Sequence, residues 1–307
     1  MTDSQDVTRF ERLVHKMDAH SKLLRAWELK GGVSAQVTAL ELLHPDGTTQ
    51  KVVVRQHGAA NLRHNPNIAA DEFKLLRILQ TAGMAAPAPI YLDESSNLFA
   101  TPIIVIEFIE GTPEFAPTNV ADVVLQLATH LVNIHAVDGA NPDLAFLPQQ
   151  ENSIAQKLKE RPATPDESLD EGRIRDALER VWPLPQRNPR NPATLLHGDF
   201  WPGNALWKDG QLAAIIDWED ASVGDPLADA GNSRLEILWA FGAEAMQQFT
   251  EHYKSMTPID FTSLPWWDLC AALRPASKIG TWGLDAAVET KMRAGHKWFV
   301  KQAFENL

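Results

Sequence analysis

One stretch of the sequence, residues 195–226, gathers oxygen-bearing side chains around a short apolar run. Asp199 and Asn204 lie five positions apart and are separated by a Pro-Gly pair, which excludes a regular helix between them. Asp217 comes thirteen residues after Asn204, directly behind the run LAAII. A carboxylate on a tight loop can accept a proton or orient a hydroxyl, and carboxamide and carboxylate oxygens are hard ligands that suit Mg²⁺. These residue types at this spacing indicate a site for phosphoryl transfer.

The same residues also have ordinary structural interpretations. An Asp or Asn in a Pro-Gly loop commonly closes a turn, and His197 can be a packed structural histidine. The combination is more specific than its members, because His-Gly-Asp-x4-Asn is followed by Ile-Asp at the end of a strand-like run. Glu219 lies two residues beyond Asp217 and can point into the same space if the chain stays extended. Glu219 and Asp220 are therefore candidates for contact with substrate or with metal-bound water.

Two regions with different patterns of apolar residues must position these side chains. Residues 21–108 favour strands, with glycine-containing turns between apolar runs, and they include one helix expected over 69–82. A first helix is expected over 7–20 from the helical spacing of its apolar residues. Beyond residue 111 helical spacing dominates, and two short strand candidates bracket the Asp199 loop. The sequence therefore predicts a small β-rich lobe followed by a larger helical lobe.

The composition restricts the class of protein. The chain has 307 residues, 44% of them hydrophobic and 22% charged, which is ordinary for a globular protein of two domains or lobes. Its single cysteine, Cys270, excludes an internal disulfide framework and fits a reducing cytosol. The formal net charge of −12 argues against a nucleic-acid partner. No apolar run reaches the ~20 residues that cross a bilayer, so we expect a cytoplasmic protein without membrane contact.

The opening segment resembles the family of aminoglycoside phosphotransferases and choline kinases, which shares the protein-kinase-like fold. The family pattern is H-G-D-x4-N followed by I-D-x-[DE], and this chain has HGDFWPGN and IDWED. The resemblance covers roughly residues 23–240. It implies an α+β fold with a small antiparallel β-sheet N-lobe containing one key helix, and a larger, mainly helical C-lobe. It divides the chain into a nucleotide-binding lobe, 1–108, and a helical lobe with the catalytic loop and the acceptor site, 109–307.

The roles of the family's residues carry over by position. Asp199 would be the catalytic base, and Asn204 and Asp217 would hold Mg²⁺ on the phosphates of ATP, so ATP and Mg²⁺ are the cofactors that the resemblance implies. His197 would brace the catalytic loop. The two aspartates of the following GDPLADAG are expected to brace that loop or to cap a helix rather than to perform chemistry.

The resemblance also places a cation and an acid in the first lobe. The position that kinases generally fill with lysine holds Arg55. Arginine keeps a permanent charge and can bond two phosphate oxygens, but its geometry differs from that of lysine. Its partner on the following helix should be Glu72, with Asp71 as the near alternative.

Two further segments are assigned to the nucleotide, mainly by resemblance. The run LKGGVSAQV lies between two strands and could cover the phosphates through Gly31, Gly32 and Ser34, although paired glycines in a hairpin are commonly structural. The run IIVIEFIEG occupies the place of the segment that joins the lobes, where backbone groups would bond the adenine edge. The residues assigned to this contact are Glu107, Phe108 and Ile109.

The acceptor is expected to be a small hydroxylated molecule that is aminoglycoside-, macrolide- or choline-like. The acidic residues that follow Asp217 suit a cationic acceptor, and a neutral one stays open. Arg274 and Lys278, in the tract LRPASKIGTWGLD, would argue against a strongly cationic acceptor if they lay near its pocket, but the sequence does not place them.

Two other classes of function stay open at this point. One is a nucleotide-binding regulator that keeps the fold without catalysis, which only Arg55 favours. The other is a metal-dependent hydrolase built on His197 and Asp199, for which the sequence shows no multi-histidine ligand set. The sequence gives no indication of the oligomeric state or of a preference between ATP and GTP.

Overall fold

The structure is a computed structural model, and it describes residues 4–29, 35–95, 97–183 and 191–307. Contacts divide the chain into two compact units. The first comprises Met1–Gly111 and Ala213–Glu219, and the second comprises Thr112–Leu212 and Asp220–Leu307. The short segment that carries Asp217 therefore packs with the N-terminal part of the chain, which the sequence pattern did not indicate.

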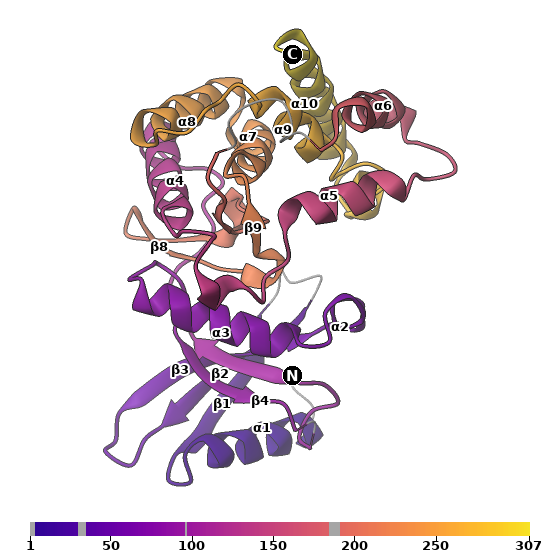
Figure 1. The fold of residues 1–307 in the computed structure, drawn as a ribbon. Coiled ribbons are helices and arrows are strands. Elements are labelled where there is room, and N and C mark those ends of the chain that lie inside the picture. Colours follow the sequence, from indigo (N-terminus) through magenta and orange to yellow (C-terminus); the bar gives the residue numbers. More distant parts are fainter. Residues whose placement is uncertain (1–3, 30–34, 96, 184–190) are drawn as a thin grey trace. The chain divides into compact units, whose positions relative to one another are not determined.

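The first unit is built on one antiparallel sheet of five strands (Figure 1). The strand order is β1-β2-β3-β5-β4. The register places Arg55 of the central strand opposite Val37 of β2 and Ile104 of β5. The elements are α1 (Ser4–Met17), β1 (Lys22–Glu28), β2 (Ala35–Leu43), β3 (Thr49–His57), α2 (Ala59–His64), α3 (Ile68–Thr81), β4 (Pro89–Asp93) and β5 (Ile103–Glu107).

The alternation of β3 separates an apolar face of the sheet from a polar one. Val52 and Val54 join the core that α1 forms with the sheet, where they lie among buried residues such as Leu13. Because successive side chains of a strand point to opposite faces, Arg55 and His57 point to the other face. Helix α3 covers that face, as Figure 1 shows. The charged cluster described below is thus placed by the two-residue period of one strand.

Helix α3 brings an acid to that polar face. Its buried side chains include Glu72, Leu75, Leu76 and Leu79, which recur at helical spacing and share one side of the helix. Gly83, with φ +69°, follows the last turn, and Met84 N donates to the carbonyl of Leu79 at 3.0 Å. The glycine supplies the left-handed conformation that ends a helix at low steric cost.

The second unit is mainly helical. Its longest buried element is α7, which packs against α8, α9 and α10 and is buried around most of its surface. Helices α4 and α10 are capped by Asn119 and Asp285, which accept the backbone N–H three residues on. The elements are α4 (Val120–His135), α5 (Gln150–Lys159), α6 (Glu171–Val181), β6 (Thr194–Leu196), β7 (Ala205–Lys208), β9 (Ser222–Gly224), α7 (Leu227–Phe241), α8 (Ala243–Met256), α9 (Leu264–Ala272) and α10 (Ala286–Glu305). Strand β8 (Gln211–Ile215) begins in this unit, and its last residues belong to the first.

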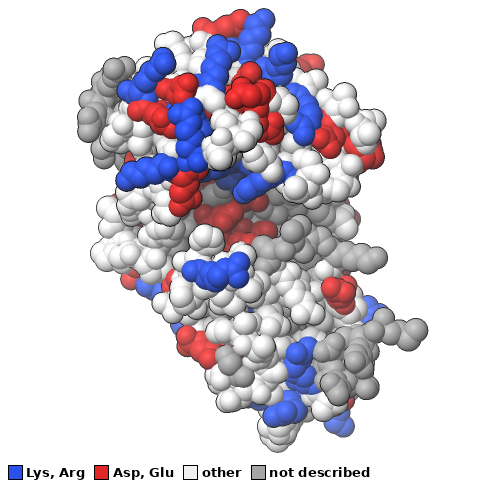
Figure 2. All heavy atoms as spheres, turned by 90° about the vertical axis from the view of Figure 1, so that its right-hand side faces the viewer, with Lys and Arg blue, Asp and Glu red and all other residues white. Residues whose placement is uncertain are grey.

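Charge on the second unit is mixed rather than segregated on the face that Figure 2 draws. Lys and Arg lie there among Asp and Glu. Within the described ranges, none of the helices is both long enough and apolar enough to cross a membrane.

The α+β fold class predicted from the sequence is confirmed. Helices α1 and α3 match the helices expected over 7–20 and 69–82 to within a few residues. Among the described residues of the charged, proline-containing region 150–190 lie the helices α5 and α6.

Candidate active site

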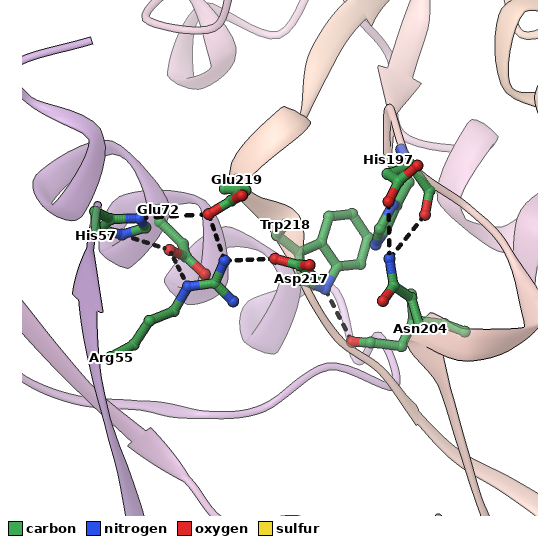
Figure 3. Close-up of polar contacts among 10 residues, drawn as sticks. Arg55, His57, Glu72, His197, Asn204, Asp217, Trp218 and Glu219 are labelled. Carbon is green, nitrogen blue, oxygen red and sulfur yellow. Dashed lines mark hydrogen bonds and ion pairs between the residues drawn. The ribbon is translucent and has the colours of Figure 1, made fainter. Parts of the chain in front are cut away.

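Arg55 lies at the centre of a group of carboxylates in the first unit (Figure 3). Its Nη2 contacts Asp217 Oδ1 and lies 2.5 Å from Glu219 Oε2. Its Nε lies 3.4 Å from Glu72 Oε2. Of the two acids considered as partners of Arg55, Glu72 therefore stands beside it, whereas Asp71 hydrogen-bonds elsewhere.

His57 adds a second basic group that the sequence analysis did not single out. It lies two residues after Arg55 on β3, so the strand period turns it to the same face. Its Nε2 lies 2.9 Å from Glu72 Oε2, and its Nδ1 lies 3.5 Å from Glu219 Oε2. The two-residue period of β3 that turns Arg55 to this face also predicts that His57 lies there.

Burial and charge act against each other in this cluster. Burial opposes the charged form of Arg55, but Glu72 and the other carboxylates outweigh it and hold the pKa of Arg55 above its usual range. Burial also disfavours charge on His57, but the neighbouring carboxylates of Glu219 and Glu72 raise the pKa of His57. Burial raises the pKa of Asp217, and Arg55 acts in the opposite direction. Three carboxylates therefore share two basic groups.

The backbone around Asp217 holds this carboxylate in an uncommon conformation. Asp217 has φ +69°, in the left-handed region, which aspartate tolerates better than most residues. Just before it, Ile215 N donates to the Ala85 carbonyl at 2.7 Å. Just after it, the indole Nε1 of the buried Trp218 donates to the Ile215 carbonyl at 2.9 Å. Backbone strain of this kind persists where surrounding bonds over-determine the structure, which is common at functional sites.

Asp199 lies in the second unit, on the loop between β6 and the 3-10 turn η4 (Pro202–Asn204). Its Oδ1 accepts from Arg274 Nη2 at 2.6 Å. Asn204 Nδ2 donates to Asp199 Oδ2 at 3.2 Å and to the Asp199 carbonyl at 3.0 Å, as Figure 3 shows. The buried ring of His197 accepts the Asp199 backbone N–H through Nδ1 at 3.2 Å. The Asp199 side chain keeps 30% exposure, so it is held in place yet reachable.

Arg274 is a member of this site that the sequence did not place. Besides its bond to Asp199, its Nη1 donates to the carbonyl of Gly198 at 2.7 Å. It comes 75 residues after Asp199 along the chain, on the segment that follows α9, so no local pattern could have joined the two.

Gly198 and Gly203 allow approaches that a side chain would block. Gly198 has φ +82°, and a Cβ there would lie 2.0 Å from the carbonyl oxygen of Asp220. A Cβ at Gly203 would lie 2.2 Å from the ring of Trp201. Both glycines of HGDFWPGN are therefore required by close packing of the loop. Asp220, a predicted contact residue, meets this loop through its backbone.

One buried carboxylate, Asp229 on α7, fixes the loop to the helical core. Its oxygens accept from the backbone N–H of His197 at 2.7 Å and of Gly198 at 2.9 Å. His135 Nε2 lies 3.2 Å from Asp229 Oδ2, and His135 Nδ1 lies 2.6 Å from the Tyr253 hydroxyl. Burial opposes ionisation, but His135 and the loop amides outweigh it and lower the pKa of Asp229. The bracing role expected for an aspartate of GDPLADAG is confirmed.

The remaining nucleotide candidates belong to the first unit. Glu107 ends β5, where its backbone N–H donates to the Ala88 carbonyl at 2.8 Å. Phe108 packs its ring 6.1 Å from that of Trp27, and Ile109 is partly buried. The three residues predicted to cover the phosphates, Gly31, Gly32 and Ser34, lie outside the described residues.

The donor atoms fit a magnesium ion by their chemistry. Because Asn204 Nδ2 bonds Asp199, its Oδ1 is left as a hard acceptor, and no hydrogen bond to it is found among the described residues. Asp217 offers a carboxylate in a group that is short of positive charge. Mg²⁺ commonly takes one or two protein ligands together with phosphate oxygens rather than a protein cage. The described ranges contain no group of three or more His, Cys, Asp or Glu arranged to hold a metal ion.

The chain is similar to parts of larger animal proteins. Over 202 residues it is 27% identical to acyl-CoA dehydrogenase family member 10 of Mus musculus, which covers 61% of this chain and 18% of that protein. Over 211 residues it is 24% identical to acyl-CoA dehydrogenase family member 11 of Homo sapiens, with 62% and 26% covered. The chain thus spans about a fifth to a quarter of the length of these relatives.

Solved structures share the fold at low sequence identity. The GDP complex of an aminoglycoside 2'-phosphotransferase-IIIa variant matches with a TM-score of 0.66 at 18% identity, covering 97% of this chain and 95% of that one. A macrolide 2'-phosphotransferase of type I matches with a TM-score of 0.66 at 16% identity, covering 97% and 98%. A further neighbour, with a TM-score of 0.60 at 17% identity and coverages of 95% and 97%, is an aminoglycoside phosphotransferase in a ternary complex with ADP and hygromycin B.

Residues 28–272 match the phosphotransferase enzyme family, APH, which is most of the chain. The match includes Arg55 and Asp199 and ends with α9, two residues before Arg274. The chain belongs to the phosphotransferase enzyme family and is a kinase-type enzyme with the protein-kinase-like fold.

Proposed function

We propose that this protein transfers the γ-phosphoryl group of ATP to a hydroxyl of a small molecule, assisted by Mg²⁺. The observation that carries the proposal is the geometry of Asp199. Its carboxylate is oriented by Asn204 and Arg274 on a loop that Asp229 ties to a buried helix, and it still reaches solvent. A fixed, accessible carboxylate is what a base for a hydroxyl proton requires.

Residues of the first part of the chain, 1–108, are proposed to bind the nucleotide. Arg55, fixed by Glu72 and buried to 7% exposure, would present its charge to the phosphates. The glycine turn with Gly31, Gly32 and Ser34 would cover the phosphates, and the backbone of 107–109 would bond the adenine edge. That ADP and GDP occupy fold neighbours supports a purine nucleotide as the donor.

Asn204 and Asp217 are proposed as the protein ligands of Mg²⁺. Their oxygens are of the type this ion prefers, and the excess of carboxylate around Arg55 favours a divalent cation. When bound, the ion would offset negative charge on the phosphates as the γ-phosphoryl group moves. Glu219 and Asp220 would act at a longer range, through water or substrate.

The chemistry assigned to Asp199 is a proton transfer. The acceptor oxygen forms a bond to the γ-phosphorus while the bond from that phosphorus to the β,γ-bridging oxygen breaks. The electron pair of the broken bond leaves with ADP, and the hydroxyl proton passes to the Asp199 carboxylate. Arg274 and Asn204 hold this carboxylate in one orientation, and His197 and Asp229 hold the loop that carries it. The part from 109 onward therefore supplies the catalytic loop and the acceptor site.

The test is transfer of labelled γ-phosphate from ATP or GTP to a panel of alcohols. The panel contains kanamycin, hygromycin B, a macrolide, choline, amino alcohols, sugars and hydroxy acids. We expect labelled product with at least one alcohol, and we expect removal of Mg²⁺ by EDTA to abolish its formation. Binding of Mg·ATP without transfer to any alcohol would instead support a non-catalytic regulator, and release of phosphate from simple esters without ATP would support a hydrolase.

A further inference from the structure

A group of cations lies beside the catalytic loop in the second unit. Arg274 bonds both the Asp199 carboxylate, at 2.6 Å, and the Gly198 carbonyl, at 2.7 Å. The exposed Lys278 follows four positions later, and its backbone N–H donates to the Pro275 carbonyl at 3.0 Å in the same turn. Lys157, on α5, completes the group. Its carbonyl accepts from Arg175 Nη1 at 2.8 Å, and Glu171, the partner of Arg175, accepts through Oε2 from the hydroxyl of Ser277 on that turn at 3.4 Å. The charge of Lys157 also interacts with those of Arg274 and Lys278. We call Lys157, Arg274 and Lys278 the basic cluster.

Lys157 is the partly buried lysine of the basic cluster. Its side chain is partly buried, and it forms no ion pair within the part of the chain that the structure describes. Arg175, another nearby cation, is already paired with Glu171 at 2.9 Å. Burial, and then the charges of Arg274 and Lys278, lower the pKa of Lys157 to about 8. The sequence has 40 acidic against 28 basic residues, so unpaired positive charge here is not a consequence of composition. Such an arrangement is typical of a site that an anion completes.

A nearby carboxyl does not offset this charge. Glu236, partly buried on α7, lies close enough to Asp199 and Arg274 for their charges to act on it. Burial, and then the charge of Asp199, raise the pKa of Glu236 to about 8, so this group is mostly neutral at pH 7. Asp199 is itself paired with Arg274. Asp199 and Glu236 therefore offer little uncompensated negative charge to an ammonium group.

We propose that the acceptor is an alcohol that also carries an anionic group, a carboxylate or a phosphate ester, which Lys157 and Lys278 bind while its hydroxyl lies at Asp199. This inference rests on the proposed phosphotransferase function and names the substrate class. It differs from the cationic acceptor that the acidic residues after Asp217 favour. Asp217 and Glu219 are paired with Arg55, and the buried Asp229 is occupied by His135 and by the backbone N–H groups of His197 and Gly198. Arg274 connects the two parts of the site, since it bonds the catalytic carboxylate and belongs to the basic cluster.

The first test measures binding with four probes on one scaffold. Gluconate carries a carboxylate, glucose 6-phosphate a phosphate ester and glucosamine an ammonium group, and glucose is neutral. Calorimetric titration is done in the presence of Mg²⁺ and a non-hydrolysable ATP analogue. We expect at least one anionic probe to bind tenfold or more tightly than glucose and glucosamine, with weaker binding at high salt. The stronger of the two anionic probes identifies the anion. Binding of glucosamine that equals or exceeds that of both anions, or no binding of either anion, would overturn the proposal.

The second test uses matched lysine variants. Lys157→Gln and Lys278→Gln should each weaken binding of the preferred anion about tenfold, and leave the affinity for the ATP analogue unchanged. Lys159→Gln, an exposed lysine on the same helix α5, is the control and should leave anion binding unchanged. Because Lys157 lacks an ion-pair partner, Lys157→Gln should not lower the melting temperature, which separates loss of binding from loss of fold. Equal anion affinity in Lys157→Gln and Lys159→Gln would overturn the assignment.

The phosphate-transfer assay tests the anionic acceptor separately from the proposed phosphotransferase function. Phosphorylation of amino sugars but not of hydroxy acids or phosphorylated alcohols would leave the phosphotransferase function intact and refute an anionic acceptor. Lys157-dependent anion binding without transfer to any alcohol would support the anion site and refute the phosphotransferase function. Preferential phosphorylation of anionic alcohols, reduced in Lys157→Gln, would support both.

Discussion

The charged clusters around Arg55 and around Asp199 have opposite imbalances of charge. Around Arg55, three carboxylates share one guanidinium and one imidazole, so this group is short of positive charge. In the second cluster, the Asp199 carboxylate is paired with Arg274 of the basic cluster, and the raised pKa of Glu236 keeps that carboxyl mostly neutral. This cluster therefore has an excess of positive charge. In an acidic protein the second imbalance is the less expected one. The comparison teaches that the first cluster is suited to receive a cation and the second to receive an anion.

Removal of Arg55 should have the largest effect on stability. Arg55→Met would leave Glu72, Asp217 and Glu219 without their shared partner in a mostly buried place, and losses of about 3–5 kcal/mol are typical when one partner of a buried ion pair is removed. Arg55→Lys keeps the charge but replaces the separate Nε and Nη2 groups, which face different carboxylates, by one ammonium group, so we expect a smaller loss of about 1 kcal/mol. Urea denaturation measures both. If Arg55→Met is no less stable than Arg55→Lys, the first cluster is not short of positive charge.

Close packing of the catalytic loop should make Gly198 sensitive to one methyl group. Gly198→Ala places a Cβ 2.0 Å from a backbone carbonyl at φ +82°, so we expect a loss of about 2–5 kcal/mol and no detectable transfer. Gly210→Ala is the matched control, because its φ is +75° but nothing lies within 4 Å of the added Cβ. It should lose about 1 kcal/mol and keep its activity. Similar losses in urea denaturation for the two variants would show that the contact with Asp220 does not constrain the loop.

The pH dependence of stability should show the charges of the second cluster as a smaller effect. Glu236 has a folded pKa of about 8, above the ordinary 4.5, so its contribution to stability is full below pH 4.5 and is lost as the pH rises to about 8. Lys157 has a folded pKa of about 8, below the ordinary 10.5, so its contribution is full above pH 10.5 and is lost as the pH falls to about 8. Together they should lower stability most near pH 8.

Two variants measure these contributions separately. Glu236→Gln should gain stability relative to the wild type above pH 8, and Lys157→Gln should gain it below pH 8, each by an amount on the order of 1 kcal/mol. Urea denaturation from pH 5 to pH 10 provides the curves. Parallel curves for the wild type and both variants would contradict the charge balance described for this cluster.

The sequence predicted those parts of the site that lie in local patterns. The loop from His197 to Asn204 and the segment at Asp217 form continuous motifs, and Arg55 and Glu72 lie at fixed places on a strand and the next helix. Such features follow from short-range periodicity and turn chemistry, so they can be read without the fold. His57 was available from the same strand period but was overlooked.

The remaining members of the site depend on tertiary packing. Arg274 reaches Asp199 across 75 residues, and Lys157 and Glu236 come from two other helices. The residues next to them in the sequence do not distinguish these side chains from ordinary surface charges. Their roles depend on burial and on charged partners that only the folded chain brings together. The contact of His135 with Asp229 has the same origin, because 94 residues separate the two along the chain.

The most direct test of the account is the effect of Asp199→Asn on phosphoryl transfer, compared with its effect on nucleotide binding. Asparagine has nearly the shape of aspartate but cannot take the hydroxyl proton, so we expect the rate of transfer to fall about 10²- to 10⁴-fold while the Kd for Mg·ATP changes little. Asp209→Asn, an exposed aspartate with φ +52°, is the control and should keep full activity. Transfer by Asp199→Asn at the wild-type rate would show that Asp199 is not the base and would contradict the account.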